Sequence, residues 1–262
     1  MLRVCNFGGG KNSTALLIEA VRRVERPDLI LFADTGGEKP ETYAHVAAFS
    51  RWLVERGFPE ITVVRCERED GVATLEEECL LNSTLPSKVF GFSGCSVKWK
   101  VQPQDKYLSQ HPDVLAAWER GEKVERWLGF HADERHRMDR RLEKDAADVK
   151  WSYRYLLIEW DMGQAECEAV LVGMQMVVGK SSCFYCPSMK KHEIRALQRQ
   201  HPPLLERALV MERRARPGLR EKEGLGSHFA WEDYLRQPEL PFGTACDVSG
   251  GPDLCDSCYD GE

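Results

Sequence analysis

Short apolar runs alternate with helical patterns along the first part of the chain. Residues 3–7, 29–33 and 61–65 are apolar runs of strand length, as expected for buried strands. Apolar positions at helical spacing fill the segments between them, over about 13–24 and 41–56. Strands that alternate with helices pair in parallel through right-handed crossovers. The pattern therefore predicts an α/β fold in which helices cover both faces of a parallel sheet.

The pattern is less regular beyond residue 66. Expected helices cover about 74–79, 104–122 and 164–172, and expected strands or extended segments cover 125–130 and 153–158. A basic helical region then spans 190–222, whereas the stretch over 232–262 is acidic. The basic region therefore has two candidate partners, a polyanion and the acidic end of the chain itself.

The composition is ordinary for a globular protein. The chain has 262 residues, 42% of them hydrophobic, and a net charge of −6. No apolar run approaches the roughly 20 residues that a membrane span needs. The first expected strand begins at Arg3, which leaves no room for a signal peptide. We therefore expect a cytoplasmic protein without a membrane partner.

A glycine-rich loop follows the first expected strand and reads Gly8-Gly9-Gly10-Lys11-Asn12-Ser13-Thr14. Glycines let backbone N–H groups turn toward an anion, and a helix that begins at Ser13 or Thr14 adds its free N–H groups and positive dipole end. The spacing differs from that of the common phosphate loop, Gly-x₄-Gly-Lys-Ser/Thr. The loop favours a phosphate or pyrophosphate, with Lys11 and Ser13 as catalytic residues.

Other polar segments also follow expected strands. Asp34-Thr35-Gly36 ends the second one, and ligands of parallel sheets bind at the carboxyl ends of strands. This segment and the glycine loop are therefore expected to face one nucleotide. Arg135 and Arg137 lie in a charged run after the strand over 125–130, and guanidinium groups suit phosphate or sulfate oxygens.

The sequence has ten cysteines. In a reducing compartment, clustered thiols indicate metal or redox chemistry more than disulfides. The segment 183–187, Cys-Phe-Tyr-Cys-Pro, is a Cys-x-x-Cys closed by proline and indicates a metal site. We interpret the cysteines that stand alone in apolar or helical stretches as packing residues: Cys5, Cys66, Cys79 and Cys167. The others lie in loop-like settings: Cys95, Cys183, Cys186, Cys246, Cys255 and Cys258.

Two lysines, Lys98 and Lys100, follow Cys95 closely. Nearby cations lower the pKa of a thiol, so we expect Cys95 to ionise readily. The same lysines and the basic region over 190–222 are candidate contacts for a nucleic-acid backbone.

These motifs, in this order, resemble the phosphoadenosine phosphosulfate reductase family, within the adenine-nucleotide alpha-hydrolase (PP-loop ATP pyrophosphatase) superfamily. The glycine loop is similar to its Ser-Gly-Gly-Lys-Asp-Ser, with Gly8 in place of Ser and Asn12 in place of Asp. Residues 33–42 match the family's Asp-Thr-Gly…Pro-Glu-Thr segment, and residues 94–103 match its Cys-x₄-Lys-x₂-Pro segment. Residues 128–135 match Gly-x-Arg-x-x-Glu, with His131 in place of Arg. Residues 182–187 match the late Cys-x-x-Cys-Pro. The resemblance covers about residues 3–215.

The resemblance implies a sheet of the adenine-nucleotide alpha-hydrolase type. It also implies a nucleotide-binding domain over 1–178 and a Cys-rich, helical region over 179–262 that completes a metal site. The nucleotide would be ATP or an adenylyl sulfate, with Mg²⁺ on its phosphates. Its expected binding residues are Gly8, Gly9, Gly10, Lys11, Asn12, Ser13, Thr14, Asp34, Thr35, Gly36, Arg135 and Arg137.

Iron–sulfur members of the family hold a [4Fe–4S] cluster with a Cys-Cys pair and a later Cys-x-x-Cys. In this sequence Gly94 occupies the first position of the pair, which leaves Cys95, Cys183 and Cys186 as ligands. We take Cys258 as the fourth ligand, with Cys255 or Cys246 as alternatives, or else one iron stays open. We favour the [4Fe–4S] cluster, and zinc is the alternative metal because four thiolates also suit it.

Three functions follow as hypotheses. The first is an ATP pyrophosphatase that adenylates a substrate and supports sulfur transfer through the cluster, with a nucleic acid among the acceptors. The second is an adenylyl sulfate reductase that forms sulfite, in which Cys255 or Cys258 would have to replace the family's Glu-Cys-Gly-Leu-His nucleophile. The third is a non-catalytic nucleotide-binding iron–sulfur sensor or partner subunit, which Asn12 motivates. The sequence leaves open a sulfur-donor or redox protein partner and a homo-oligomer.

Overall fold

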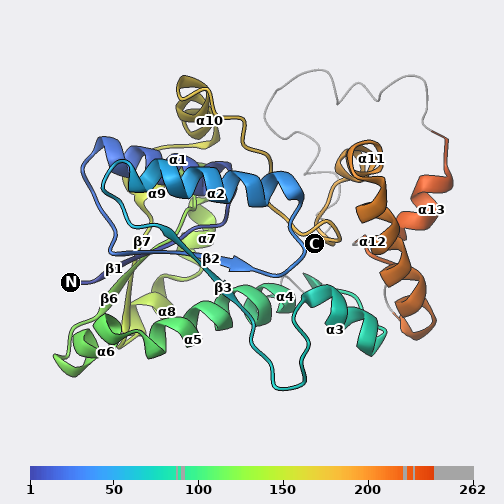
Figure 1. Cartoon of the computed structure of the whole chain (residues 1–262), viewed down its shortest axis with the longest axis horizontal. Coiled ribbons are helices and arrows are strands. Elements are labelled where there is room, and N and C mark those ends of the chain that lie inside the picture. Colours follow the sequence, from blue (N-terminus) through green and yellow to red (C-terminus); the bar gives the residue numbers. More distant parts are fainter. Residues whose placement is uncertain (87, 90–91, 221–222, 227, 239–262) are drawn as a thin grey trace.

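A five-stranded sheet forms the centre of the molecule, a computed structural model (Figure 1). The strand order is β3-β2-β1-β6-β7, and every neighbouring pair is parallel, which confirms the expected α/β fold. The strands are β1 (Arg3–Asn6), β2 (Leu29–Asp34), β3 (Ile61–Arg65), β6 (Val124–Trp127) and β7 (Trp151–Arg154); β4 (Lys88–Val89) and β5 (Phe92–Ser93) form a separate antiparallel pair. The structure describes residues 1–86, 88–89, 92–220, 223–226 and 228–238.

Helices occupy most of the remaining described chain. The α-helices are α1 (Lys11–Arg22), α2 (Pro40–Val54), α3 (Leu75–Asn82), α4 (Gly94–Ser96), α5 (Gln102–Gln110), α6 (Pro112–Glu119), α7 (Arg135–Asp139), α8 (Leu142–Ala147), α9 (Leu156–Glu159), α10 (Gln164–Gly173), α11 (Lys191–Gln200), α12 (Pro202–Ala215) and α13 (Trp231–Arg236). A π-helical segment, η1 (Val97–Val101), joins α4 to α5, and short 3₁₀ turns are η2 (Ala132–Glu134) and η3 (Arg216–Gly218). No helix in the described ranges is both long and apolar enough to span a membrane.

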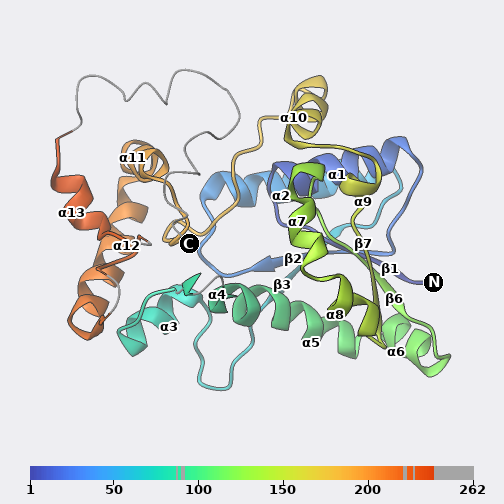
Figure 2. The same ribbon diagram turned by 180° about the vertical axis from the view of Figure 1, so that it is seen from behind.

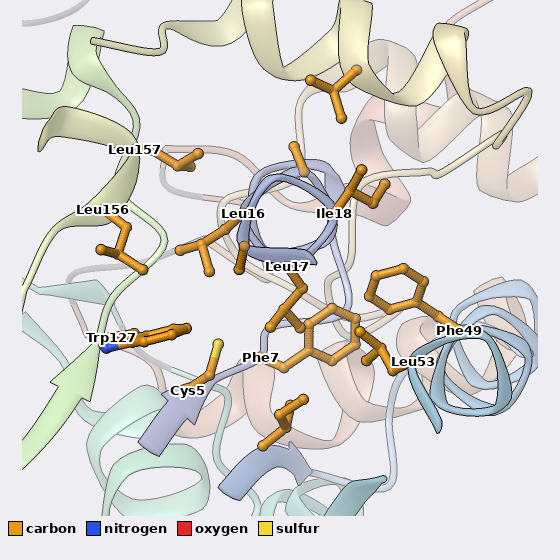
Figure 3. Close-up of a cluster of buried hydrophobic side chains, with 14 of the residues drawn as sticks. Cys5, Phe7, Leu16, Leu17, Ile18, Phe49, Leu53, Trp127, Leu156 and Leu157 are labelled. Carbon is orange, nitrogen blue, oxygen red and sulfur yellow. The ribbon is translucent and has the colours of Figure 1, made fainter. Parts of the chain in front are cut away.

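The sheet has a hydrophobic core on each face, because successive strand residues point to opposite sides. Phe7, directly after β1, and Phe32 of β2 pack with α1, α2, α9 and α10, and Figure 3 shows this core around α1 seen end-on. On the opposite face Val4 and Leu31 pack with residues of α5 and α6. Both cores thus anchor the loops that leave the carboxyl ends of β1 and β2.

A third core lies outside the sheet, where α11, α12 and α13 stand together (Figures 1 and 2). It combines α3 and η1 with residues 183–189 and these last helices. Trp99, Tyr185 and Trp231 are fully buried in it. This core draws residues from both sides of the expected domain boundary at 178, and the division itself stays a prediction.

The buried carboxylate of Glu212 closes the end of this core. It accepts hydrogen bonds from the backbone N–H groups of Leu225, Trp231 and Glu232, at 2.6, 2.8 and 2.8 Å. Three donors satisfy a carboxylate that is only 1% exposed and that would otherwise be costly to bury. The side chain of α12 thus fixes the start of α13.

Several expected elements differ in extent. The helix over 104–122 is two helices, α5 and α6, because Pro112 forces the preceding His111 into an extended conformation with ψ 128°. The expected extended segment over 153–158 leaves the sheet after Arg154 and continues as the short helix α9. The strand expected over 125–130 ends at Trp127. Apolar runs of this length do not distinguish strand from buried helix.

Two glycines with the same backbone conformation allow a matched test. Gly36 and Gly57 have φ of +74° and +76°, but a Cβ on Gly36 would lie 2.3 Å from Cγ2 of Thr74, whereas one on Gly57 meets nothing within 4 Å. We expect Gly57→Ala to lower the free energy of unfolding by about 1 kcal/mol. Gly36→Ala should cost at least about 3 kcal/mol, because Thr74, the N-cap of α3, must also move. Urea denaturation measures both, and equal losses would contradict the steric argument.

Candidate functional site

The glycine loop connects β1 to the N-terminus of α1. Gly9 has a φ of +73°, and a Cβ there would lie 3.1 Å from the ring of Phe32. The helix begins at Lys11, with Gly10 as its N-cap, not at Ser13 or Thr14 as expected. The N–H groups of the first helical turn have no intrahelical acceptor and are available to an anion. The loop therefore presents the backbone of residues 11–13 in the way that phosphate binding requires.

The hydroxyl groups of Ser13 and Thr14 both donate to the Gly10 carbonyl, at 3.1 and 2.9 Å. Thr14 Oγ1 also lies 2.9 Å from Nε2 of His45 on α2. These bonds hold the first turn of α1 against the loop. A catalytic role for Ser13 stays a prediction, and its hydroxyl hydrogen would have to leave Gly10 to reach a ligand.

The side chain of Lys11 is engaged in an ion pair. Its Nζ lies 2.7 Å from Oε1 of Glu168 on α10, and the two side chains are 44% and 42% exposed. The hydrogen bond from Lys11 lowers the pKa of the Glu168 carboxyl. Glu168 thus neutralises the ammonium group of Lys11, which the sequence predicts to bind a nucleotide phosphate. A phosphate that binds Lys11 must first displace the Glu168 carboxylate.

Asp34 serves as an acceptor for its own loop. Its carboxylate, 1% exposed, accepts from Tyr43 Oη at 2.7 Å, from the Gly36 N–H at 2.8 Å and from Arg65 Nη2 at 2.9 Å. Burial and this hydrogen bond raise the pKa of Tyr43. The arrangement indicates that Asp34 shapes the loop after β2, and direct contact with a nucleotide stays a prediction.

The loop after β2 contacts the Cys-x-x-Cys segment. Thr35 Oγ1 lies 2.9 Å from the sulfur of Cys183, and the Phe184 N–H donates to the Gly37 carbonyl at 2.8 Å. A Cβ on Gly37 would lie 2.3 Å from the Tyr185 hydroxyl oxygen. Only glycine therefore allows this close approach without movement of the tyrosine.

The glycine loop contacts the same segment. Ser181 Oγ donates to the Gly8 carbonyl at 2.6 Å, and a Cβ on Gly10 would lie 3.0 Å from Ser181 Oγ. Residues 181–184 therefore bridge the two loops that the sequence analysis expects to share a nucleotide. We call the three hydrogen bonds that Ser181, Cys183 and Phe184 form with these loops the loop bridge.

Four cysteines of the described chain lie in the third core or directly beside it. Cys79 and Cys183 belong to the third core, and Cys95 packs against it. The Cys186 N–H donates to the Cys183 carbonyl at 3.0 Å. Cys79 is buried in this core, as the sequence predicts for a packing residue. Cys246, Cys255 and Cys258 lie outside the described residues.

The expected easy ionisation of Cys95 is wrong. Burial is the largest effect and raises the pKa of its thiol, Cys186 acts in the same direction, and Lys100 only partly opposes them. Both lysines have carboxylate partners, which the sequence did not reveal: Lys98 pairs with Glu78, and Lys100 pairs with the buried Glu38 at 3.2 Å. Burial likewise raises the pKa of Cys183 to about 12.

The expected metal site is not assembled by the described side chains alone. Within the part of the chain that the structure describes, no group of three or more His, Cys, Asp or Glu side chains is arranged so that it could hold a metal ion. A site formed by Cys95, Cys183 and Cys186, with a cluster or with zinc, therefore stays a prediction.

The two arginines expected to bind the nucleotide, Arg135 and Arg137, have their described contacts away from the glycine loop and the loop after β2. Arg137 pairs with Glu134 and lies over the ring of Phe130, 3.9 Å from its centroid, and Arg135 is exposed. The segment before them does approach the loop, since a Cβ on Gly129 would lie 3.5 Å from Cα of Ser13. A nucleotide contact of either arginine stays a prediction.

The basic region over 190–222 pairs with acidic side chains at several points. Arg207 pairs with Glu76 of α3, while Arg213 and Arg216 pair with Glu232 and Asp233 of α13. The sequence left two candidate partners for the basic region, a polyanion and the acidic end of the chain. The ion pairs with Glu232 and Asp233 show that the start of the acidic stretch is one of them. These ion pairs reduce the positive charge available to a polyanion.

No family model and no curated protein matches this sequence. A search of solved structures finds the U34-tRNA thiolase NcsA from Methanococcus maripaludis with its [4Fe–4S] cluster. The alignment covers 99% of this chain and 80% of that chain, at 15% sequence identity and a TM-score of 0.45. Similarity at this level establishes neither a shared function nor a shared site.

A substitution can test whether Asp34 stabilises the loop after β2. We expect Asp34→Asn to lower the free energy of unfolding by about 2 kcal/mol, because the amide turns a donor toward buried donors and leaves Arg65 without its charge partner. The control is Asp28→Asn, whose exposed carboxylate accepts from the Arg3 N–H at 2.8 Å and should cost less than about 1 kcal/mol. Equal losses in urea denaturation would contradict the anchoring role.

Proposed function

We propose that this protein is an ATP pyrophosphatase that adenylates a substrate and supports the transfer of sulfur to it. The loop bridge supports this proposal most directly, because it holds the Cys-x-x-Cys segment against both the glycine loop and the loop after β2. A nucleotide bound to the glycine loop would therefore have thiols as neighbours. This arrangement suits a reaction that first activates a substrate with the nucleotide and then delivers sulfur.

The first step uses the glycine loop and α1. A substrate oxygen attacks the α-phosphorus of ATP, the bond between the α-phosphorus and the bridging oxygen breaks, and pyrophosphate leaves with the bonding electrons. Backbone N–H groups of residues 11–13 and the Lys11 ammonium stabilise the charge that develops on the leaving group. Mg²⁺ neutralises the phosphates and binds them with water ligands. Lys11 joins only after it has separated from Glu168.

In the second step a sulfur nucleophile attacks the activated atom of the substrate, and AMP leaves with the electrons of the broken bond. A [4Fe–4S] cluster held by Cys95, Cys183 and Cys186 supplies the sulfur-handling chemistry when it is bound. Thr35 positions Cys183 through the contact between Oγ1 and the sulfur. A sulfur-donor protein or inorganic sulfide supplies the sulfur itself.

We propose a nucleic acid as the first acceptor class to test. The region over 190–222 is rich in Lys and Arg, and such side chains contact phosphate backbones. Its ion pairs with Glu76, Glu232 and Asp233 imply that only part of this charge is available for binding.

The products formed from nucleotides test the proposal. The full chain is purified without oxygen and incubated with Mg-ATP, inorganic sulfide and total tRNA, and separately with adenylyl sulfates and a thiol reductant. AMP and pyrophosphate from ATP, with sulfur retained in the RNA, are the expected result. Sulfite from an adenylyl sulfate, with ATP unchanged, would instead establish the reductase. Tight ATP binding with neither product would favour the sensor.

Lys11 and Glu168 give a pair of opposite predictions. Lys11→Met should reduce ATP turnover roughly a hundredfold, because the developing charge loses its cation. Glu168→Gln should tighten ATP binding roughly two- to fivefold, since an exposed ion pair no longer competes for Lys11. Isothermal titration measures the binding.

The double variant K11M/E168Q is the control for this pair. It should bind ATP as weakly as K11M alone, because Glu168 acts through Lys11. Unchanged turnover in K11M would contradict the assigned role of Lys11, and a gain from E168Q in the absence of Lys11 would contradict the competition.

A further inference from the structure

We infer that His45 is a positioning residue, which donates a hydrogen bond to Thr14 and thereby leaves the hydroxyl group of Ser13 free to bind a phosphate. The inference rests on the proposed function, because it concerns the loop that would hold ATP, and it adds a residue of α2 to the support of that loop. It also divides the work of two neighbouring hydroxyl groups, since Thr14 serves the fold whereas Ser13 serves the ligand.

The hydroxyl group of Thr14 has two polar neighbours. Its Oγ1 lies 2.9 Å from the Gly10 carbonyl oxygen and 2.9 Å from Nε2 of His45. A carbonyl oxygen only accepts, so the hydroxyl hydrogen of Thr14 points to Gly10. Because a hydroxyl group has one hydrogen, it turns a lone pair toward His45, and Nε2 must carry the hydrogen of the second bond. A chain of donors thus runs from His45 through Thr14 to Gly10.

The carbonyl of Gly10 has three donors for two lone pairs. The Thr14 N–H lies at 3.0 Å, the Thr14 hydroxyl at 2.9 Å and the Ser13 hydroxyl at 3.1 Å. The two donors of Thr14 are the closer ones. The hydroxyl hydrogen of Ser13 is therefore the one that can turn to another acceptor while the carbonyl stays satisfied.

Burial separates the two hydroxyl groups in the same way. Thr14 is fully buried, whereas Ser13 retains 8% of its surface. Ser13 Oγ also lies 3.8 Å from the position of a Cβ on Gly8, so it borders the glycine loop itself. A phosphate oxygen on the N–H groups of residues 11–13 would have this hydroxyl as a neighbouring donor.

Aromatic packing fixes the ring of His45. Its centroid lies 5.5 Å from that of Phe49, with 16° between the planes, and 6.3 Å from that of Phe7. Figure 3 shows Phe49 pointing from α2 toward α1. Burial lowers the pKa of His45, so its ring is neutral at neutral pH and has a single N–H. The stack directs Nε2, and with it this N–H, to Thr14.

Nitrogen NMR of the imidazole tests the first bond in the absence of any nucleotide. The full chain is labelled with nitrogen-15 in its histidines, and His45→Phe identifies the signals of His45 by their loss. We expect a neutral ring with its hydrogen on Nε2, and slow exchange of that hydrogen with water. A hydrogen on Nδ1 together with a bare Nε2 would overturn the inference.

Pyrophosphate binding, measured by isothermal titration, tests the consequence for the loop. His45→Phe keeps a ring between Phe7 and Phe49 but has no donor, and it should weaken binding about fivefold, the usual effect of one hydrogen bond. His45→Gln places an amide N–H about as far along the side chain as Nε2 and should bind within about twofold of the unaltered chain. His45→Asn is one carbon shorter and should resemble H45F.

A double-mutant cycle with Ser13→Ala separates this role from a general loosening of the helix. In the S13A chain, H45F should cause no further loss of pyrophosphate binding, because His45 acts through the Ser13 hydroxyl. The same loss from H45F with and without Ser13 would contradict the inference, as would full binding by H45F. Circular dichroism reports the fold of each variant, and the comparison of H45Q with H45N remains decisive if H45F does not fold.

The outcomes also separate this inference from the proposed function. If the unaltered chain binds pyrophosphate but forms no AMP from ATP, the proposed reaction fails whereas the role of His45 stands. If the chain forms AMP while His45 carries its hydrogen on Nδ1, only the inference fails. Absence of pyrophosphate binding in the unaltered chain would overturn both.

Discussion

The loop bridge is the constraint on which the site depends. The glycine loop and the loop after β2 are fixed by the sheet, but neither contains a thiol. Hydrogen bonds from Ser181, Cys183 and Phe184 attach the thiol-bearing segment to both loops at once. Gly37 makes this possible, because any side chain there would collide with Tyr185. The bridge joins the third core directly to the loop that begins α1, in addition to the contacts of α3 and η1 with the loop after β2.

Charge compensation is the second theme of the structure. The three lysines that the sequence marked as ligand contacts, Lys11, Lys98 and Lys100, each have a carboxylate partner from another element of the chain. The partners differ in burial, since Glu38 is fully buried and Glu168 is almost half exposed. An exposed pair separates at small cost, whereas a buried pair is structural. Lys11 is thus the cation best suited to change partners.

The sequence was sufficient for β1, β2 and β3, because these strands are apolar runs near glycine or proline and the helices between them have clear periodicity. It was less accurate for β6 and β7, whose segments mix charged and apolar residues and are only partly strand. It was also sufficient for the placement of the glycine loop and Asp34 at carboxyl ends of strands. It was not sufficient for local contacts. The split at Pro112 was readable from the proline alone. The carboxylate partners of the lysines, and the approach of Cys79 to Cys95, come from tertiary packing that no local pattern encodes.

The carboxylate of Glu212 has a consequence for the order in which the protein forms during synthesis. The core around α1 needs nothing beyond Val178. The core that contains Cys79 and Cys183 includes Trp231, and Glu212 gains its last N–H donor only from Glu232. On the ribosome the core around α1 can therefore close early, while the thiols of Cys79 and Cys183 stay open to solvent until nearly the whole described chain has emerged. The interior of the third core is accessible up to that moment and is enclosed afterwards.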